Sequence, residues 1–230
     1  MRILDQLGIR AYRIPSGRVA FGHLRRMAPL SENFGFDREG GPVDRGYIEQ
    51  FLQENRHSVQ GRVLEIGDNE YTLRFGQKEN LKSEVLHVHA DNPVATIVGD
   101  LAHLPQVADA SFDCIILTQT LHLIYDFHAA LNTCYRILRP GGTLLLTVPG
   151  ITPIDHGEWK EIWYWSFTEA SVKRLAKEHF PEGHAEVATR GNVLVATAFL
   201  YGLGLKDLRQ SELDHVDPYY PVVILARITK

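Results

Sequence analysis

A short strand that ends on an acid and a glycine is the part of this sequence best suited to bind a ligand. Residues 61–67 read GRVLEIG, an apolar run that carries one acid, Glu65, and closes on Gly67. Open α/β sheets bind their ligands at the carboxyl ends of parallel strands. A glycine at such an end also lets a ligand approach the backbone closely. We therefore expect the binding site to be built around Glu65 and Gly67.

Two histidines are the candidates for proton transfer. His122 and His156 follow two later apolar strands, and histidine titrates near neutral pH. Either could act as a general base, and the alternative for each is a histidine bonded only to backbone or solvent. The eleven histidines form no HExxH motif, and the two cysteines, Cys114 and Cys134, lie in segments expected to be buried. We therefore predict reduced thiols and no metal site.

Apolar strands and amphipathic helices alternate around these residues. Strands are expected at 63–66, 85–89, 97–100, 112–117, 143–148, 186–188 and 222–228. Helices are expected at 43–55, at 127–138 after the cap Asp126, from Thr168 to before Pro181, and at 192–203. Too few residues separate the second and third strands for a crossover helix, so a loop must join them. This alternation predicts a parallel sheet with helices on both faces.

The first 41 residues differ in character from the rest. Between Met1 and Arg26 there are six arginines and one acid, Asp5. A solvated extension is the simpler interpretation. The alternative is a lid or an oligomer contact that offers guanidinium groups to an anionic acceptor. We divide the chain into an N-terminal extension or lid, 1–41, and a single domain, 42–230.

Composition excludes several function classes. The chain has 230 residues, 44% of them hydrophobic and 23% charged, with a formal charge of −4 and a pI near 6.3. These values suit a globular domain and argue against nucleic acid as the main partner. No window approaches the 18 or so uncharged apolar residues of a membrane span, and the first residues lack the core of a secretory signal. We expect a cytoplasmic protein without a membrane partner.

Four landmarks in order resemble the class I S-adenosylmethionine-dependent methyltransferases. They are VLEIG at 63–67, GDL at 99–101, SFDCIIL at 111–117 and RILRPGGTLLLTVPG at 136–150. The resemblance covers about 61–150, the expected cofactor half, and leaves about 151–230 as the acceptor-side half. It implies an α/β fold with a doubly wound, mostly parallel sheet of the seven-stranded type, flanked by helices, with an antiparallel C-terminal strand.

The resemblance also implies residues that hold the cofactor, S-adenosyl-L-methionine. Gly67 would let the methionine end approach the backbone, and Glu65 would hold the ammonium group through water. Asp100, followed by Leu101, matches the acid that accepts a hydrogen bond from the adenine amino group. The methionine portion would also meet two residues after the fourth strand, Gln119 and Thr120. A plain helix-cap role is equally open for Thr120.

Two positions depart from the family pattern. After Gly67 the family usually has two further glycines, where this chain has Asn69 and Tyr71. Asparagine tolerates left-handed geometry well, so we predict that Asn69 takes the turn. The acid that usually ends the second strand and binds the ribose is also missing, and the register puts His89 there. We predict Asp91 in that role, because a carboxylate can accept from two hydroxyls.

The predicted function is O-methylation of a small-molecule or carbohydrate acceptor by in-line transfer. His122 or His156 would remove the hydroxyl proton, and a homo-oligomer is compatible with the sequence. The tryptophans at 159, 163 and 165 would form a stacking wall for a flat or sugar-like acceptor, or else pack in the core. The alternative function is an inactive, methyltransferase-like binding or scaffolding module with a degenerate glycine loop. A nicotinamide-dependent oxidoreductase is disfavoured, because no GxGxxG follows the first strand.

Overall fold

The computed structural model describes residue 20 and residues 22–230, so four of the N-terminal arginines, Arg2, Arg10, Arg13 and Arg18, lie outside the described residues. The strands are β1 (Arg62–Ile66), β2 (Lys82–His87), β3 (Ile97–Val98), β4 (Phe112–Thr118), β5 (Leu138–Pro149), β6 (His184–Arg190) and β7 (Val223–Thr229). The helices are α2 (Val43–Glu54), α3 (Glu70–Phe75), α4 (Phe127–Ile137), α5 (Glu169–His179), α6 (Val193–Leu200) and α7 (Gln210–Asp214). None of these described helices is long and apolar enough to cross a membrane.

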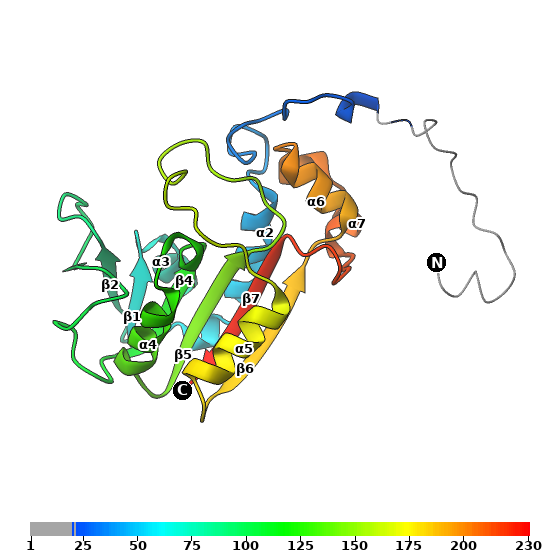
Figure 1. Ribbon diagram of the computed structural model, residues 1–230. Coiled ribbons are helices and arrows are strands. Elements are labelled where there is room, and N and C mark those ends of the chain that lie inside the picture. The colour runs from blue at the N-terminus through cyan, green and yellow to red at the C-terminus, as the bar shows by residue number, and fades with distance from the viewer. Residues whose placement is uncertain (1–19, 21) are drawn as a thin grey trace, which may run out of the picture.

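The seven strands form one sheet in the order β3-β2-β1-β4-β5-β7-β6 (Figure 1). The pairs from β3 to β5 are parallel. Only β7 runs antiparallel to its neighbours, β5 and β6. The predicted fold class is confirmed, including the antiparallel C-terminal strand.

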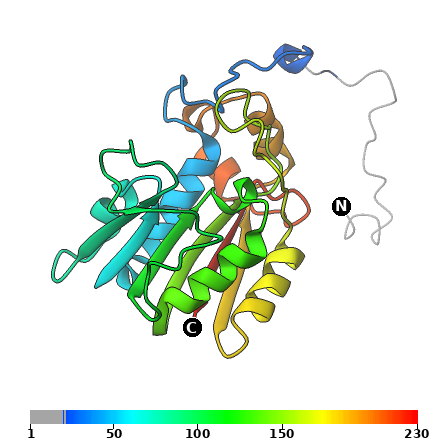
Figure 2. The ribbon, with the colours of Figure 1, turned by 60° about the vertical axis from the view of Figure 1, so that its left-hand side comes forward.

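The central strand β4 shows how both faces of the sheet are covered. Successive side chains of a strand point to opposite faces. Ile115 and Leu117 accordingly join the core under α4 and α5, whereas Cys114 and Ile116 join the core under α2 and α6. Figures 1 and 2 show α4 and α5 on one face and α2 on the other. Burial on both faces explains why this strand is a continuous apolar run. Cys114 and Cys134 are both buried free thiols, as predicted.

The connection from β2 to β3 is a loop without a helix, as its length predicts. The backbone N–H groups of Thr96 and Gly99 donate to the carbonyls of Val85 and His87, at 3.0 Å each, and hold β3 beside β2. The prediction that β2 extends to His89 is wrong, because the strand ends at His87. This two-residue difference changes which side chain stands at the carboxyl end of β2.

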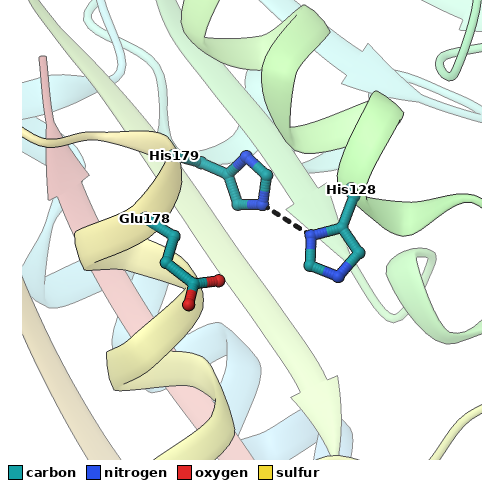
Figure 3. A group of neighbouring side chains, drawn as sticks. All are labelled: His128, Glu178 and His179. Atoms are coloured by element: carbon teal, nitrogen blue, oxygen red, sulfur yellow. Dashed lines mark hydrogen bonds between the residues drawn. The ribbon is translucent and has the colours of Figure 1, made fainter.

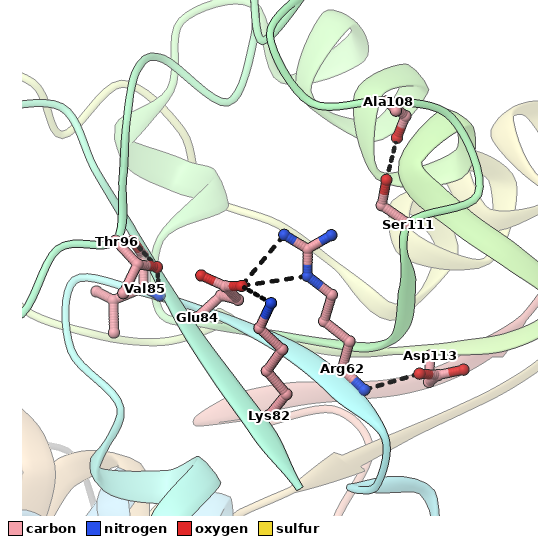
Figure 4. A network of polar contacts seen from close by, with 8 residues as sticks. All are labelled: Arg62, Lys82, Glu84, Val85, Thr96, Ala108, Ser111 and Asp113. Carbon is pink, nitrogen blue, oxygen red and sulfur yellow. Dashed lines mark hydrogen bonds and ion pairs between the residues drawn. The ribbon is translucent and has the colours of Figure 1, made fainter. Parts of the chain in front are cut away.

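Polar contacts fasten the amino ends of the central strands. Glu84 on β2 forms ion pairs with Arg62, at 3.1 Å, and with Lys82, at 3.2 Å (Figure 4). Asp113 on β4 accepts hydrogen bonds from the backbone N–H of Arg62 and from the Arg139 guanidinium, both at 2.7 Å. Arg139 belongs to the RPGG landmark, so part of that landmark joins strands at the edge of the sheet opposite the expected site.

The described part of the N-terminal extension packs against the acceptor-side half. The backbone N–H of Leu30 donates to the carbonyl of Tyr201, at 2.8 Å. Arg38 forms two hydrogen bonds with Asp207, at 2.6 and 2.7 Å. The ring of Phe34 lies between α6 and the loop after β5, where it contacts other aromatic rings. Residues 30–38 are therefore tied to the body of the domain.

Two predicted helix caps offer a test of the local structure. Asp126 accepts from the backbone N–H of Ala129, at 2.9 Å, and makes an exposed cap for α4. Asn192 accepts from the N–H of Val195 at the start of α6. The amide of Asn192 is buried and also donates to the carbonyls of Glu212 and His215, at 2.8 Å each.

We expect Asn192→Ala to lower the free energy of unfolding by about 2–3 kcal/mol, since a cap and two further hydrogen bonds are lost together. Asp126→Ala, the matched control, should cost only about 1 kcal/mol because it removes a cap alone. Urea unfolding followed by circular dichroism measures both. Equal losses in the two variants would contradict this account of Asn192.

Candidate functional site

A cavity of about 460 Å³ opens at the carboxyl ends of β1, β2 and β4. Its lining brings together six residues that the sequence singled out: Glu65, Gly67, Asp100, Leu101, Gln119 and Thr120. Arg45, Tyr71, His87 and Trp159 also line it. Residues more than fifty positions apart therefore meet at one edge of the sheet, as the parallel topology requires.

Four other predicted residues lie outside this lining, and one of them, His122, lines an adjoining pocket that is described below. Asn69 points its amide to Ser83, with Nδ2 donating to Oγ at 3.1 Å. Asp91 lies in the exposed loop after β2, and His156 is exposed in the loop after β5. The geometry gives no support to the predicted roles of Asn69 and Asp91 in cofactor binding or of His156 in catalysis.

The left-handed turn after β1 is made by Gly67. Gly67 has φ +92°, whereas Asn69 has φ −132° as the residue before α3. The prediction that Asn69 takes the left-handed conformation is therefore wrong. One glycine is enough here, because α3 begins at Glu70. A Cβ placed at Gly67 would meet no atom within 4 Å, so the backbone faces open space in the cavity wall.

Glu65 holds the start of α3. Its carboxylate oxygens accept from the backbone N–H groups of Tyr71, at 3.2 Å, and Thr72, at 2.7 Å. The first N–H groups of a helix lack partners within the helix, and a carboxylate is a favourable one. The side chain is only 2% exposed, and this burial raises the pKa of Glu65 to about 7 against the opposing effect of the bonds from Thr72. Glu65 thus shapes the loop that borders the cavity.

An imidazole stands where a carboxylate was expected at the end of β2. His87 is the last residue of that strand and lines the cavity. The backbone N–H of His89 donates to its Nδ1, at 3.1 Å. The sequence predicts His89 at this position and not His87, because the two histidines of the run VLHVH are two residues apart. In a strand such residues point to the same face, so the pattern does not distinguish them.

Gln119 is strained and lies at the end of β4. Its φ is +46°, in the left-handed region that non-glycine residues rarely occupy. Its backbone N–H donates to the carbonyl of Thr147, at 3.0 Å, which holds the strained turn in place. Such strain persists where the surrounding structure maintains it, often at a functional site.

A second and narrower pocket, of about 70 Å³, adjoins the cavity. The two share Arg45, Gln119 and Trp159. The rest of its wall is mostly aromatic and comprises Phe34, Phe36, Asp44, His122, Thr152, Trp163 and Phe199. Phe34 stacks on Trp163 with ring centres 6.1 Å apart and planes 9° apart, and the His122 ring lies 4.3 Å from Trp163. We call this pocket the aromatic slot.

Three polar atoms of the aromatic slot are buried and have no hydrogen-bond partner among the described residues. They are Nε2 of Gln119, Nδ1 of His122 and Nε1 of Trp163. Buried polar groups in proteins nearly always have a partner. In the part of the chain that the structure describes, two further side-chain atoms are in this state, on Thr72 and Arg227. Their gathering in one slot indicates a place where a ligand supplies the missing partners.

Burial shifts the pKa values of two ionisable side chains in the slot. It lowers the pKa of His122 to about 4, so the ring is neutral at neutral pH. Burial also raises the pKa of Asp44 above its usual value, and the neighbouring Arg45 opposes that change. Asp44 and Arg45 lie in the first turn of α2. Sequence reasoning missed Arg45, although a cation is unfavourable at a helix start and could have marked it.

The three tryptophans divide between slot and core. Trp159 and Trp163 line the slot, whereas Trp165 donates its Nε1 hydrogen to the carbonyl of Ile124, at 3.1 Å, and packs edge-on against Phe127. The segment that holds them has no helix or strand. Trp165 therefore packs against the core, and the stacking role of Trp159 and Trp163 toward an acceptor stays a prediction.

Sequence comparisons show a similarity to methyltransferases over part of the chain. A model of the methyltransferase domain matches residues 48–146, which include β1 to β4 and most of β5. A protein from Mycolicibacterium smegmatis, described as a probable S-adenosylmethionine-dependent methyltransferase, is 38% identical over 147 residues, or 59% of this chain and 53% of that protein. These matches support the resemblance of residues 48–146 to the class I S-adenosylmethionine-dependent methyltransferases.

Further relatives match shorter stretches of the chain or share only its fold. The ubiquinone/menaquinone biosynthesis C-methyltransferase UbiE of Klebsiella pneumoniae is 33% identical over 98 residues, which are 41% of this chain and 37% of UbiE. A methyltransferase structure from Archaeoglobus fulgidus has a TM-score of 0.55 at 12% identity and covers 81% of this chain and 94% of its own. The plantazolicin methyltransferase BamL has a TM-score of 0.54 at 13% identity, with 86% and 94% covered. The chain spans about half the length, or less, of the curated relatives it matches.

The residues of the larger cavity fit S-adenosylmethionine, the cofactor of the family that the chain resembles. Gly67 leaves room that a Cβ would take, and Gln119 offers an amide without a partner. Asp100 accepts from the backbone N–H of Ala102 through Oδ1, at 2.8 Å, which fixes a carboxylate on the cavity wall. These three residues would hold the cofactor, with His87 in the wall at the end of β2.

We expect Gly67→Val to abolish cofactor binding, because its side chain would enter the cavity. Gly141→Val is the matched control: Gly141 has φ +79°, its Cβ would also meet nothing within 4 Å, and it lies outside the cavity. Both variants carry similar backbone strain, of about 1–2 kcal/mol. Calorimetry with S-adenosylhomocysteine should show binding to the control only, and equal affinity in the two variants would refute the placement.

Glu65→Gln should change the pH dependence of stability. The pKa of Glu65 is about 7 in the fold against an ordinary value of 4.5, so the folded state holds a proton that the unfolded state has released. The contribution of Glu65 to the free energy of unfolding is therefore fully present below pH 4.5, and it is lost as the pH rises through 7. Relative to wild type, the variant should therefore gain up to about 3 kcal/mol between these pH values, since a tenfold change in an ionisation constant is worth about 1.4 kcal/mol. Urea unfolding at several pH values measures the difference, and a constant difference would contradict the assignment.

Proposed function

We propose that this protein transfers a methyl group from S-adenosylmethionine to a small, flat acceptor that carries oxygen atoms and binds in the aromatic slot. The observation that carries the proposal is the group of three unpartnered polar atoms, on Gln119, His122 and Trp163, buried among aromatic rings beside the cofactor cavity. Rings offer flat surfaces with little loss of side-chain freedom on binding. The polar atoms would favour an acceptor whose oxygen atoms can form hydrogen bonds with them.

The polarity of these atoms defines the acceptor further. The Gln119 amide and the Trp163 indole are donors, so they need acceptor atoms such as carbonyl, phenol or carboxylate oxygens. Neutral His122 can donate or accept through Nδ1, depending on its tautomer. The slot is also narrow, at about 70 Å³, which suits a single ring that extends toward the shared wall at Arg45 and Trp159. A carbohydrate acceptor is less suited to these donors and ring walls.

Methylation of a hydroxyl needs a group that takes its proton, since the cofactor supplies an electrophilic methyl group and a neutral leaving group. A pKa of about 4 makes His122 a weak base, so we assign to it a hydrogen bond that orients the acceptor oxygen. Asp44 lines the same slot, and burial raises its pKa toward the working range of a base. We assign proton removal to Asp44.

Methylation at a ring carbon is a second candidate, favoured by the relatives. UbiE is named as a C-methyltransferase of ubiquinone and menaquinone biosynthesis. A demethylmenaquinone methyltransferase of Corynebacterium glutamicum is 43% identical over 54 residues, 24% of this chain and 23% of that protein. Hydrogen bonds to a ring oxygen orient the adjacent carbon as well as the oxygen, so the same three polar atoms serve either reaction. In the second reaction Asp44 would take the proton that the ring carbon loses when the new C–C bond forms. An inactive scaffold has less support, since Tyr71 lines the cavity without filling it.

The test uses methyl-labelled cofactor with catechol, hydroquinone and a sugar as candidate acceptors. We expect label on the aromatic acceptors, with mass spectrometry and NMR to locate it on oxygen or carbon. Trp163→Phe keeps the ring and removes its N–H, so kcat/KM should fall about tenfold or more, while affinity for S-adenosylhomocysteine stays unchanged. Trp165→Phe, the control, should lower stability but leave kcat/KM within about twofold. Label only on the sugar, no transfer to any aromatic acceptor, or equal effects of the two variants would overturn the proposal.

A further inference from the structure

A cluster of two histidines and a glutamate joins α4 to α5 outside the cofactor cavity and the aromatic slot. His128 lies in the first turn of α4, and Glu178 and His179 lie in the last turn of α5. Nδ1 of His128 is 2.8 Å from Nε2 of His179, and Glu178 lies beside the two rings (Figure 3). One ligand atom of each residue lies within 4.8 Å of the other two. The cluster is the only group of this kind found among the described residues.

A fourth side chain fixes the tautomer of His179. Nδ1 of His179 is 2.7 Å from Oδ1 of Asn132, one turn along α4 from His128. An amide oxygen can only accept, so Nδ1 of His179 carries the proton and Nε2 holds a lone pair. That lone pair points at His128. Metal-binding histidines commonly donate their other N–H to an oxygen in this way.

Glu178 keeps one carboxylate oxygen available to a cation. Arg174 contacts Oε1 at 2.7 Å, and the carboxylate has a second oxygen for another partner. The carbonyl end of α5 adds partial negative charge beside the cluster.

We propose that His128, Glu178 and His179 bind one divalent transition-metal cation, with zinc the best match, and so cross-link α4 to α5. Two imidazoles and a carboxylate are a ligand set that zinc uses, with a fourth position for water. Nitrogen ligands of tetrahedral zinc lie roughly 3.3 Å apart at bond lengths of about 2.0–2.1 Å. Separating the two rings by about half an ångström from 2.8 Å would therefore admit the ion. The side chains involved are exposed or half-buried, so this movement is easy.

The competing interpretation is a hydrogen bond between two neutral histidines that needs no ion. It predicts that zinc does not bind at this place. The two interpretations also differ at Asn132: in the metal site this residue positions His179 and does not touch the ion. Replacing such a positioning residue commonly weakens metal binding about 10- to 100-fold.

Calorimetry with zinc chloride on the full, tag-free chain tests the proposal. We expect one equivalent to bind, with a Tm that rises with zinc concentration. His128→Ala and His179→Ala should each weaken binding at least about tenfold, and Asn132→Leu should weaken it as a positioning residue does. His184→Ala is the matched control, because His184 is an exposed histidine near a glutamate, Glu186, at 3.4 Å, outside the cluster. It should leave the affinity unchanged.

Cobalt(II) supplies a readout of coordination geometry that does not depend on enzyme activity. The wild-type protein and His184→Ala should give the intense visible absorption of a tetrahedral cobalt site, and His128→Ala should not. Circular dichroism of each variant shows that it is folded. Absence of stoichiometric zinc binding at millimolar concentration, or binding that survives both cluster variants, would overturn the proposal.

Discussion

The structure of the site depends on two hydrogen bonds from the start of α3 to the buried carboxylate of Glu65. They bring the helix onto the end of β1 and leave a single tight turn, at Gly67, between strand and helix. The carboxylate is buried at an energetic cost, which its raised pKa expresses. The carboxylate gives hydrogen-bond partners to two backbone N–H groups in the first turn of α3. Because the helix begins directly after the turn at Gly67, the loop needs no further glycine. A tyrosine can then stand in the cavity wall at position 71.

The cofactor cavity and the aromatic slot meet at the strained residue Gln119. Its backbone conformation is held by Thr147 on β5, and its amide lies between the two spaces. Arg45 also faces both spaces and donates a hydrogen bond to the Tyr71 hydroxyl, at 3.2 Å. The wall between the two spaces is therefore built from α2, α3 and the end of β4. Each of these elements is anchored to the sheet core.

Most of the fold could be predicted because its strands and helices are strongly patterned. The apolar run of β4 predicts only a buried strand, and the spacing of apolar residues in α4 predicts only a helix. The polar residues Asp126 and Asn192 mark the starts of helices. α3 escaped prediction because it has only six residues and is held by Glu65, a contact that local sequence does not reveal. The sequence puts the end of β2 at His89, two residues beyond its actual end at His87, because residues two apart in a strand share a face and fit the pattern equally well.

The site could be predicted only where family landmarks or strand ends mark it. Glu65, Gly67, Asp100 and Gln119 all lie at such ends and line the cavity. The slot is different, because its rings come from separate segments and meet only through tertiary packing. The same holds for the histidines of α4 and α5, which lie about fifty residues apart in the chain. No periodicity or spacing rule connects residues of this kind.

The packing of residues 30–38 on α6 places part of the aromatic slot outside the segment that resembles methyltransferases. Phe34 and Phe36 form one wall of the aromatic slot, yet they precede the segment, 48–146, that matches the methyltransferase domain model. Phe199, Trp159 and Trp163, which also line the slot, follow that segment. The phenylalanine and tryptophan rings of the slot therefore come from outside the matched segment, whereas Gln119 and His122 come from within it. Mutation can remodel those rings without changing the residues at the ends of β1, β2 and β4 that line the larger cavity.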